Sequence, residues 1–506
     1  MRNTNLIVGA AAFAVIGGVV AAPSSASAGG LDRYYKQHLA WKACTQGPDD
    51  EVGKELDKAG ARCADVTVPL DYANPGGRTI KIAISRLTAS DPAHRIGTML
   101  INGGGPGPAI DMPPYMKGVM GEAGPRFDLV GMDPRSLGRS AGVDCGWPSA
   151  TWIRPAGLTR GGFDRQVTFE KDLAKRCEQR GGDVMPYIST ANIARDMDVV
   201  RGALGERKLS YNGASYGTYL GAVYATLFGD KVDRMVLDSA VDPARWSPTL
   251  LRGTEGANEQ ALAHWATWTA ARNAKYGLGT SQAKVLASVH RIQRAALRKP
   301  LSIGTYKVDD AMMPGLLFAG LQDDRDEPRA SLAESVAIFD KAARTGETVQ
   351  PSADLEDGLK FMLTGDESRY GSGQAAIICG DASAPRDVEG YWRDIQRVRK
   401  SAPLFGPLTY ATTPCTFWPR PPREKPVNVT TSVPALIVAA TGDTRTTYAS
   451  SQGLYRAMSG SRLITLRGAD VHAPYQAGYG NACVNDLVNR YQVTGVLPAG
   501  APVCEK

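Results

Sequence analysis

The sequence Gly213-Ala214-Ser215-Tyr216-Gly217 limits what this chain can fold into more than any other stretch. It matches G-x-S-x-G, follows an apolar run at residues 209–211 and precedes an unbroken helix-like run at residues 218–228. Such a motif works as a sharp turn from a strand into a helix, which strains the serine backbone and lifts its hydroxyl clear of the sheet. A side chain at either glycine would collide with the neighbouring strand or helix. In a chain with 56 glycines the motif alone is weak evidence, but its context predicts that Ser215 is a nucleophile.

Strand-like and helix-like runs alternate on both sides of this motif. Residues 66–72 and 79–87 alternate apolar and polar side chains, which predicts two antiparallel strands. Compact apolar runs at 98–101, 127–132 and 234–238 predict buried strands, and residues 193–204 have helical spacing. Strands that alternate with helices predict a mostly parallel sheet covered on both faces.

The pattern changes after Pro243, and this change predicts the domain organisation. From residue 247 to about 425 the chain reads as mostly helical, and the proline-rich residues 419–426 end this region like a linker. Buried-strand character returns at residues 435–440 and 462–466. We therefore expect an α/β fold, a mostly parallel, doubly wound sheet with a large helical cap inserted before the C-terminal strands. The expected parts are a signal peptide (1–28), the first part of the core (29–246), the cap (247–425) and the C-terminal part of the core (426–506).

The N-terminus predicts export. Arg2 precedes an apolar run at residues 6–22, and Ala26-Ser27-Ala28 offers a cleavage site of small residues. A membrane anchor is the competing interpretation, but no basic stop-transfer flank follows the short run. We expect a secreted, extracellular protein without membrane attachment once the signal is removed. It should act as a monomer.

The charge of the chain gives no sign of a nucleic-acid partner. The formal net charge is +7, and the basic residues are scattered along the sequence rather than clustered in a stripe. A solvated surface explains this distribution.

All eight cysteines lie beyond the signal, and their even number in an exported chain predicts four disulfides. No C-x-x-C occurs and no histidine stands at zinc-finger spacing, so we expect no metal site. Our hypothesis for the connectivity pairs sequence neighbours, because each loop is then local. The pairs are Cys44–Cys63, Cys145–Cys177, Cys379–Cys415 and Cys483–Cys504.

A serine nucleophile needs a base, and the base needs an acid that holds its tautomer. In sheet hydrolases with this turn the order along the chain is Ser, Asp, His. Of the five histidines, His472 is the one in a loop directly after a C-terminal strand. Asp443 follows a strand and a glycine turn, so its carboxylate should lie at the carboxyl edge of the sheet. Asp238 is the rival acid, and Asp470 is too close in sequence to His472.

The glycine-rich residues 103–107 follow an early strand. They lack the G-K-[ST] of a phosphate loop and dinucleotide spacing, and a plain flexible turn is the simpler alternative. Their position suits the second donor of an oxyanion hole, where bulky side chains would block the substrate. We assign the hole to the N–H of Tyr216 together with that of Gly104 or Gly105.

Beyond these residues, the chain resembles the secreted bacterial tripeptidyl aminopeptidases of the α/β-hydrolase fold, relatives of the prolyl aminopeptidases. The resemblance covers nearly all of the mature chain. It rests on Trp41 with Cys44, residues 68–72, 102–107, 128–135 and 138–140, the turn at Ser215, residues 237–243, Asp443 with Thr446, His472, and a tail from Tyr491 to Cys504. The family usually has Gly at Ser136, Pro at Thr447 and Gly-His at Val471-His472.

The resemblance implies a serine exopeptidase without cofactor that releases short peptides, typically three residues, from free N-termini. An extracellular carboxylesterase or lipase would use the same triad, because the acyl-transfer chemistry is the same. A catalytically silent binding protein on this scaffold is a third interpretation, which the complete Ser, Asp and His disfavour.

An exopeptidase needs a feature that stops the substrate after a few residues, and we expect it in the helical cap. A free α-amine is cationic, so burying it without a partner is costly, and the cap should offer it a carboxylate. Three extended residues place that carboxylate about 10 Å from Ser215. The candidates are Glu255, Glu259, Asp323, Asp324 and Glu327, although for any single one of them a solvated surface charge is the more common role.

Overall fold

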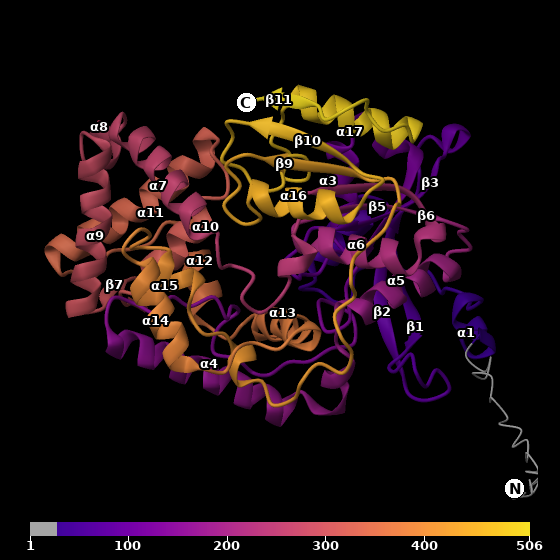
Figure 1. Ribbon diagram of the computed structural model, residues 1–506, viewed down its shortest axis with the longest axis horizontal. Coiled ribbons are helices and arrows are strands. Elements are labelled where there is room, and N and C mark those ends of the chain that lie inside the picture. The colour runs from indigo at the N-terminus through magenta and orange to yellow at the C-terminus, as the bar shows by residue number, and fades with distance from the viewer. Residues whose placement is uncertain (1–27) are drawn as a thin grey trace, which may run out of the picture.

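A nine-stranded sheet forms the centre of the larger lobe in Figure 1, in a computed structural model that describes residues 28–506. The strand order is β1-β2-β4-β3-β5-β6-β9-β10-β11. β1 (Arg62–Pro69) and β2 (Thr79–Leu87) pair antiparallel, and β2 is antiparallel to β4 (Phe127–Met132). The remaining neighbours are parallel: β3 (Gly97–Asn102), β5 (Leu209–Ala214), β6 (Val232–Asp238), β9 (Leu436–Ala440), β10 (Arg462–Arg467) and β11 (Val503–Glu505). This is the α/β-hydrolase fold.

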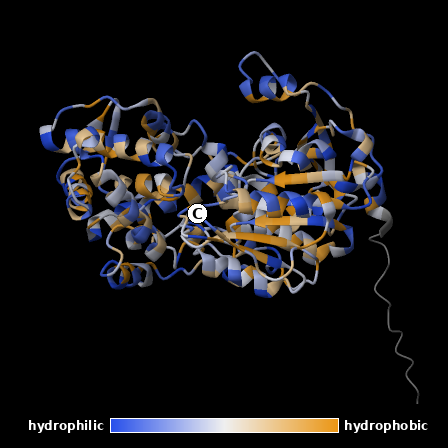
Figure 2. Cartoon of the chain, turned by 90° about the horizontal axis from the view of Figure 1, so that it is seen from above, coloured by the Kyte–Doolittle hydropathy of each residue, from blue (hydrophilic) through white to orange (hydrophobic). Residues whose placement is uncertain are grey.

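Helices cover both faces of the sheet because its strands are apolar on both sides. Along β3, Met99 and Ile101 pack into one hydrophobic cluster and Leu100 into the other, as the two-residue period of a strand requires. The first face carries α3 (Met112–Val119) and α17 (Ala482–Thr494). The opposite face carries α5 (Thr190–Ala203), α6 (Tyr216–Leu227) and α16 (Tyr448–Ala457). Figure 2 shows the strands as predominantly hydrophobic and the helices as mixed.

The chain between β6 and β9 builds most of a second, helical lobe, as the sequence predicts. This lobe has its own hydrophobic cluster and lies at the left of Figure 1. Its helices are α7 (Glu255–Ala270), α8 (Asn273–Tyr276), α9 (Gln282–Arg298), α10 (Met312–Gly320), α11 (Asp326–Thr345), α12 (Ala353–Leu363), α14 (Val388–Val398) and α15 (Gly406–Thr409). A hairpin of β7 (Leu301–Ile303) and β8 (Tyr306–Val308) is also present, and its strands are too short for a recognisable alternation.

Two further helices lie between the lobes. α4 (Arg160–Arg180) precedes α5 in sequence, yet Phe163 and Val167 on it pack with Tyr391 and Ile395 of α14. α13 (Ser368–Asp381) belongs to the inserted segment but packs into the cluster on the α5 and α6 face of the sheet. The predicted boundaries of the cap, 247 and 425, stay a proposal.

The remaining elements are short. They are α1 (Ala28–Tyr35), α2 (Glu51–Lys58) and the 3₁₀ helices η1 (Pro92–His94), η2 (Gly121–Arg126), η3 (Gly182–Tyr187), η4 (Gly229–Lys231), η5 (Pro243–Arg245) and η6 (Pro414–Phe417).

The four predicted disulfides are confirmed with the predicted connectivity, Cys44–Cys63, Cys145–Cys177, Cys379–Cys415 and Cys483–Cys504. The last pair anchors the short edge strand β11, which the sequence pattern does not reveal. Across residues 28–506, every helix is too short or too polar to cross a bilayer. The predicted signal peptide falls on residues 1–27, outside the described part of the chain, and on Ala28, the first residue of α1.

Candidate active site

The predicted strand-to-helix turn forms at Ser215, between β5 and α6. Its backbone has φ 53° and ψ −123°, a strained conformation for a residue with a side chain. The Ser215 N–H donates to the Asp238 carbonyl oxygen at 2.9 Å, which ties the turn to the neighbouring strand. A Cβ on Gly217 would lie 2.7 Å from the carbonyl oxygen of Asn102, so the close approach of β3 to α6 requires glycine there.

Asp443 and His472 meet at the carboxyl edge of the sheet, after β9 and β10. His472 Nδ1 lies 3.0 Å from both carboxylate oxygens of Asp443. The backbone N–H groups of Arg445 and Thr446 donate to Asp443 Oδ1 at 2.7 and 3.0 Å, and the Thr446 hydroxyl donates to Oδ2. These contacts hold the carboxylate in a fixed orientation toward the imidazole.

The two candidate acids have opposite electrostatic environments. Burial works against ionisation of Asp443, but the charge and hydrogen bond of His472, with hydrogen bonds from the Ser239 hydroxyl and the Arg445 N–H, hold the pKa of Asp443 below its usual value. Burial raises the pKa of Asp238 to about 8, and the nearby Asp443 carboxylate adds to this effect. Asp443 is therefore ionised at neutral pH, as the partner of an imidazolium must be.

The side chain of Asp238, the rival acid, contacts the backbone of the loop that follows His472. Its Oδ2 accepts the N–H groups of Tyr475 and Gln476 at 2.9 and 2.8 Å. Asp470 contacts another histidine: its carboxylate oxygen lies 2.6 Å from Nδ1 of His264 on α7. The contacts of both acids differ from those of Asp443, which faces His472.

The glycine-rich loop packs directly against the turn. Gly104 has φ +95°, and a Cβ there would lie 2.7 Å from Cβ of Ser215 and 3.3 Å from N of Tyr216. Its own N–H donates to the side-chain oxygen of Asn102 at 3.0 Å. Of the two predicted donors in this loop, Gly104 is therefore already engaged, which leaves the N–H of Gly105 as the better candidate.

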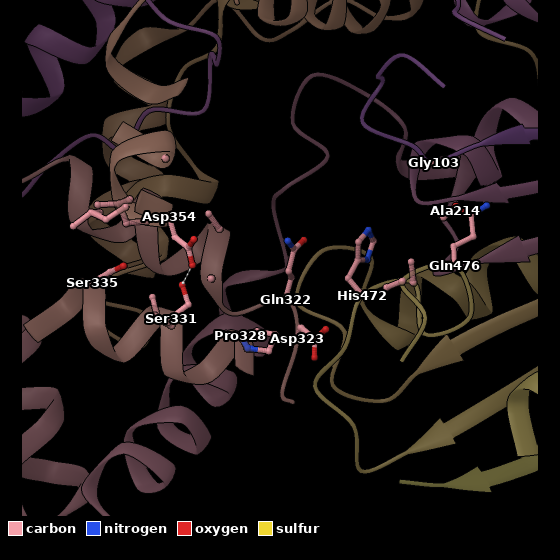
Figure 3. A pocket seen from close by; sticks show the side chains of 18 of the residues that line it. Gly103, Ala214, Gln322, Asp323, Pro328, Ser331, Ser335, Asp354, His472 and Gln476 are labelled. Atoms are coloured by element: carbon pink, nitrogen blue, oxygen red, sulfur yellow. Dashed lines mark hydrogen bonds between the residues drawn. The ribbon is translucent and has the colours of Figure 1, made fainter. Parts of the chain in front are cut away.

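A cavity of about 640 Å³ joins the histidine loop to the helical lobe. On the sheet side its lining includes Gly103, Ala214 and His472, and Figure 3 shows Asp354 and Ser331 on the helical side. Most other lining residues are apolar, and none of the described residues that line it is Lys or Arg. Two acids, Asp323 and Asp354, are among the residues of the lining.

The five predicted amine-binding acids lie in different places. Asp323 lines the cavity but is paired with Arg325, whose guanidinium contacts both carboxylate oxygens. Asp324 is buried and pairs with Lys506, and Glu327 is exposed at the start of α11.

The other two acids act within the helical lobe. Glu259 accepts the N–H groups of Leu404 and Phe405, and burial raises its pKa. Glu255 accepts the N–H of Gly253. Neither lines the cavity.

Asp354 on α12 was not predicted from the sequence. It is exposed, lines the cavity and accepts a hydrogen bond from the Ser331 hydroxyl at 2.8 Å, and among the described residues no Lys, Arg or His lies within ion-pair distance of it. Its sequence neighbours are those of an ordinary amphipathic helix, so only the packing of α12 against α11 distinguishes it. Within residues 28–506, no group of three His, Cys, Asp or Glu side chains is placed to hold a metal ion.

Comparison with known proteins identifies the family. The C-terminal part, residues 402–504, matches the family model described as TAP-like protein. The tripeptidyl aminopeptidase of Streptomyces lividans is 34% identical over 96% of this chain and 89% of that protein. The chain belongs to the tripeptidyl aminopeptidase family.

Two mycobacterial proteins are also similar. The serine protease Hip1 of Mycobacterium tuberculosis is 28% identical over 92% of this chain and 91% of its own length. Carboxylesterase B of the same species is 30% identical over 92% of this chain and 89% of its own length. As a member of the tripeptidyl aminopeptidase family with an α/β-hydrolase fold, the protein is a serine hydrolase of the peptidase type.

Proposed function

We propose that the protein is a secreted serine exopeptidase that releases short peptides, typically tripeptides, from the free N-termini of peptides and proteins. Ser215 attacks the scissile carbonyl, and His472 takes the hydroxyl proton while Asp443 holds the imidazole. The N–H groups of Tyr216 and Gly105 stabilise the oxyanion. The composition of residues 1–28 and the four disulfides support secretion.

The reaction proceeds through an acyl-enzyme. The Ser215 oxygen forms a bond to the carbonyl carbon, and the tetrahedral intermediate collapses as His472 donates its proton to the departing amine. The peptide C–N bond breaks in that step, and the N-terminal fragment stays on the serine as an ester. His472 then deprotonates a water molecule, which hydrolyses the ester and frees the fragment.

The single observation that carries the proposal is the cavity, because it has the histidine at one end and a carboxylate at the other. Asp354 lacks a cationic partner among the described residues, so its environment suits the α-amine of a substrate. Asp323 is the second acid on the lining, although Arg325 already neutralises it. A carboxylate at that end would place the cleaved bond a fixed number of residues from the N-terminus.

The test compares a tripeptide anilide that has a free amine with the same substrate acetylated. We expect acetylation to lower kcat/KM by about 2- to 5-fold, since an ion pair between the substrate amine and the exposed Asp354 carboxylate contributes about 0.5–1 kcal/mol. Asp354→Asn should lower kcat/KM for the free-amine substrate alone. The ratio of kcat/KM between the free-amine and the acetylated substrate should therefore be smaller than in the wild type.

Asp357 on the same helix is exposed like Asp354 but does not line the cavity, so Asp357→Asn is the matched control and should behave like wild type. Equal cleavage of free and acetylated substrates by the wild type would refute the exopeptidase. Turnover of a short-chain aryl ester without turnover of either anilide would instead indicate a carboxylesterase.

A further inference from the structure

Helix α13 differs from the rest of the inserted segment in where it packs. Its residues 371–379 are all buried, and several of them pack with the core of the sheet lobe. Figure 1 shows α13 between the helical lobe and the sheet. The helix therefore has few exposed positions, and its buried polar side chains must find partners inside the protein.

The first half of α13 contacts the glycine-rich loop. Gln374 Nε2 donates to the carbonyl oxygen of Pro106 at 3.2 Å, and the indole N–H of Trp152 donates to Gln374 Oε1 at 2.8 Å. The indole is a donor only, so it fixes which end of the amide faces Pro106. The Tyr370 hydroxyl lies 3.5 Å from where a Cβ on Gly105 would stand. This half of the helix thus supports the loop that supplies one predicted oxyanion donor.

The last residue of α13 connects to the other predicted donor, the residue after Ser215. Asp381 is buried and accepts the Thr190 N–H at 2.6 Å, the Thr190 hydroxyl at 2.5 Å and the Trp246 indole N–H at 2.8 Å. The Thr190 hydroxyl donates its one proton to Asp381. The Tyr216 hydroxyl, 2.9 Å from the Thr190 oxygen, must therefore donate its own proton to that oxygen. The Tyr216 ring also packs against Trp246, with ring centroids 5.3 Å apart.

The middle of the helix is held against the core at Ser136. A Cβ on Gly373 would lie 2.4 Å from the carbonyl oxygen of Ser136, so glycine allows this close approach. The Ser136 hydroxyl donates to the Gly373 carbonyl oxygen at 3.2 Å, and Ser136 has φ 80°. The Ser136 hydroxyl thus adds a polar contact to the close packing of α13.

From these contacts we propose that α13 is a brace for both halves of the oxyanion hole, with Gln374 and Asp381 as positioning residues. Gln374 acts through the loop at Pro106, and Asp381 acts through Thr190 and Trp246 on Tyr216. The proposal rests on the proposed function only in taking Tyr216 and Gly105 as the oxyanion donors. It needs no assumption about which acyl substrate the enzyme cleaves.

A brace of this kind affects the transition state more than substrate binding. Oxyanion donors work because they are fixed before charge develops on the oxygen, and loss of one donor costs a factor of about 100 to 1,000 in rate. A loosened donor should cost less than a missing one. We therefore expect a 10- to 100-fold fall in kcat with KM nearly unchanged.

The experiment uses Gln374→Met and Asp381→Asn in the full-length protein, both nearly isosteric with the native side chains. Each variant is assayed with a tripeptide anilide and with a short-chain aryl ester, after titration of active sites with a serine-directed phosphonate. A peptidyl trifluoromethyl ketone, which forms an oxyanion adduct on serine, should lose affinity in parallel with the fall in kcat. A merely structural role would lower the apparent Tm and leave the kcat per titrated site unchanged.

Gln166 on α4 provides the matched control. It is a buried glutamine whose Nε2 donates to a backbone carbonyl, that of Thr412, at 2.7 Å, and its other contacts lie outside the candidate site. Gln166→Met should lower the apparent Tm while kcat and ketone affinity stay at wild-type values. Wild-type kcat and ketone affinity in Gln374→Met would overturn the brace, even if Asp381→Asn fails to fold. If the enzyme does not cleave the anilide, kcat for the aryl ester replaces it in this test, because ester cleavage uses the same oxyanion hole.

Discussion

At the scale of single residues, two buried carboxylates near the histidine loop have pKa values shifted in opposite directions. Burial opposes ionisation of Asp443, but the charge and hydrogen bond of His472, together with the Ser239 hydroxyl and the Arg445 N–H, hold the pKa of Asp443 below its usual value. Asp238 has its pKa raised to about 8, because its burial outweighs two backbone N–H donors. Groups whose environments separate their pKa values in this way have different roles, and here the ionised one faces the imidazole.

Substitution of the two acids tests this assignment. Asp443→Asn should lower kcat by about 10⁴-fold, because an amide holds the imidazole in the wrong tautomer. Asp238→Asn keeps an oxygen to accept the N–H groups of Tyr475 and Gln476, so it should retain most activity. Ser215→Ala should abolish turnover and leave the apparent Tm near that of the wild type. The assignment of the acid is wrong if Asp443→Asn stays active and Asp238→Asn does not.

At the scale of elements, the loop that carries His472 depends on neighbours from both lobes. Its backbone is held by Asp238 at the end of β6, and the His472 N–H donates to the carbonyl oxygen of Gln322 at 2.9 Å, in the segment between α10 and α11. Val471, the residue before His472, is fully buried and packs into the hydrophobic cluster on the α3 and α17 face of the sheet. The position of the base is therefore set jointly by the sheet and the inserted segment.

The raised pKa of Asp238 predicts how the stability of this arrangement changes with pH. The unfolded chain loses the Asp238 proton near pH 3.8, whereas the folded protein keeps it up to about pH 8. Between these values the unfolded state binds fewer protons, so the free energy of unfolding falls as pH rises, by at most about 1.4 kcal/mol per pH unit for this one group.

Unfolding in urea at pH 5 through 9, with disulfides intact, measures this effect. The asparagine in Asp238→Asn cannot titrate. The free energy of unfolding of this variant minus that of the wild type should therefore rise between pH 5 and 8 and stay constant above pH 8. A constant difference across this range would show that Asp238 titrates normally in the folded protein. Asp381, whose pKa burial raises to about 6, contributes to both proteins and cancels from the difference.

At the scale of the whole molecule, disulfides fasten the segments that connect the two lobes. Cys379 on α13 is joined to Cys415 in η6, and η6 packs on α4. Cys145 is joined to Cys177 on α4 itself. The Cys44–Cys63 bond lies instead at β1, the outer strand of the sheet. The pairs therefore differ in how directly they support the candidate site.

Removal of each pair by double substitution with alanine tests this difference. Loss of either the Cys379–Cys415 or the Cys44–Cys63 bond should lower the free energy of unfolding by about 2–4 kcal/mol. Only the first should also lower kcat per titrated site, because it frees the end of α13 next to Asp381. Equal kcat per titrated site in the two variants would show that the Cys379–Cys415 bond stabilises the fold without supporting the candidate site.

The sequence by itself determined the features that depend on local chemistry. The glycines around Ser215, the apolar runs of β3, β4 and β9 and the order Ser, Asp, His are read along the chain, because a turn or a buried strand needs particular residues at adjacent positions. The disulfide pairs were also predictable, because each joins cysteines that are neighbours in sequence.

Tertiary structure alone decided which polar groups meet across the two lobes. Asp354, Gln374 and Asp381 stand in unremarkable helical sequence, and their contacts arise only where α12 faces the cavity and α13 packs between the lobes. Conversely, Glu259 and Asp324 look like free surface charges in the sequence, yet they bind backbone N–H groups and Lys506. A side chain's partner is set by how helices pack, and residues distant in sequence carry no local pattern that records it.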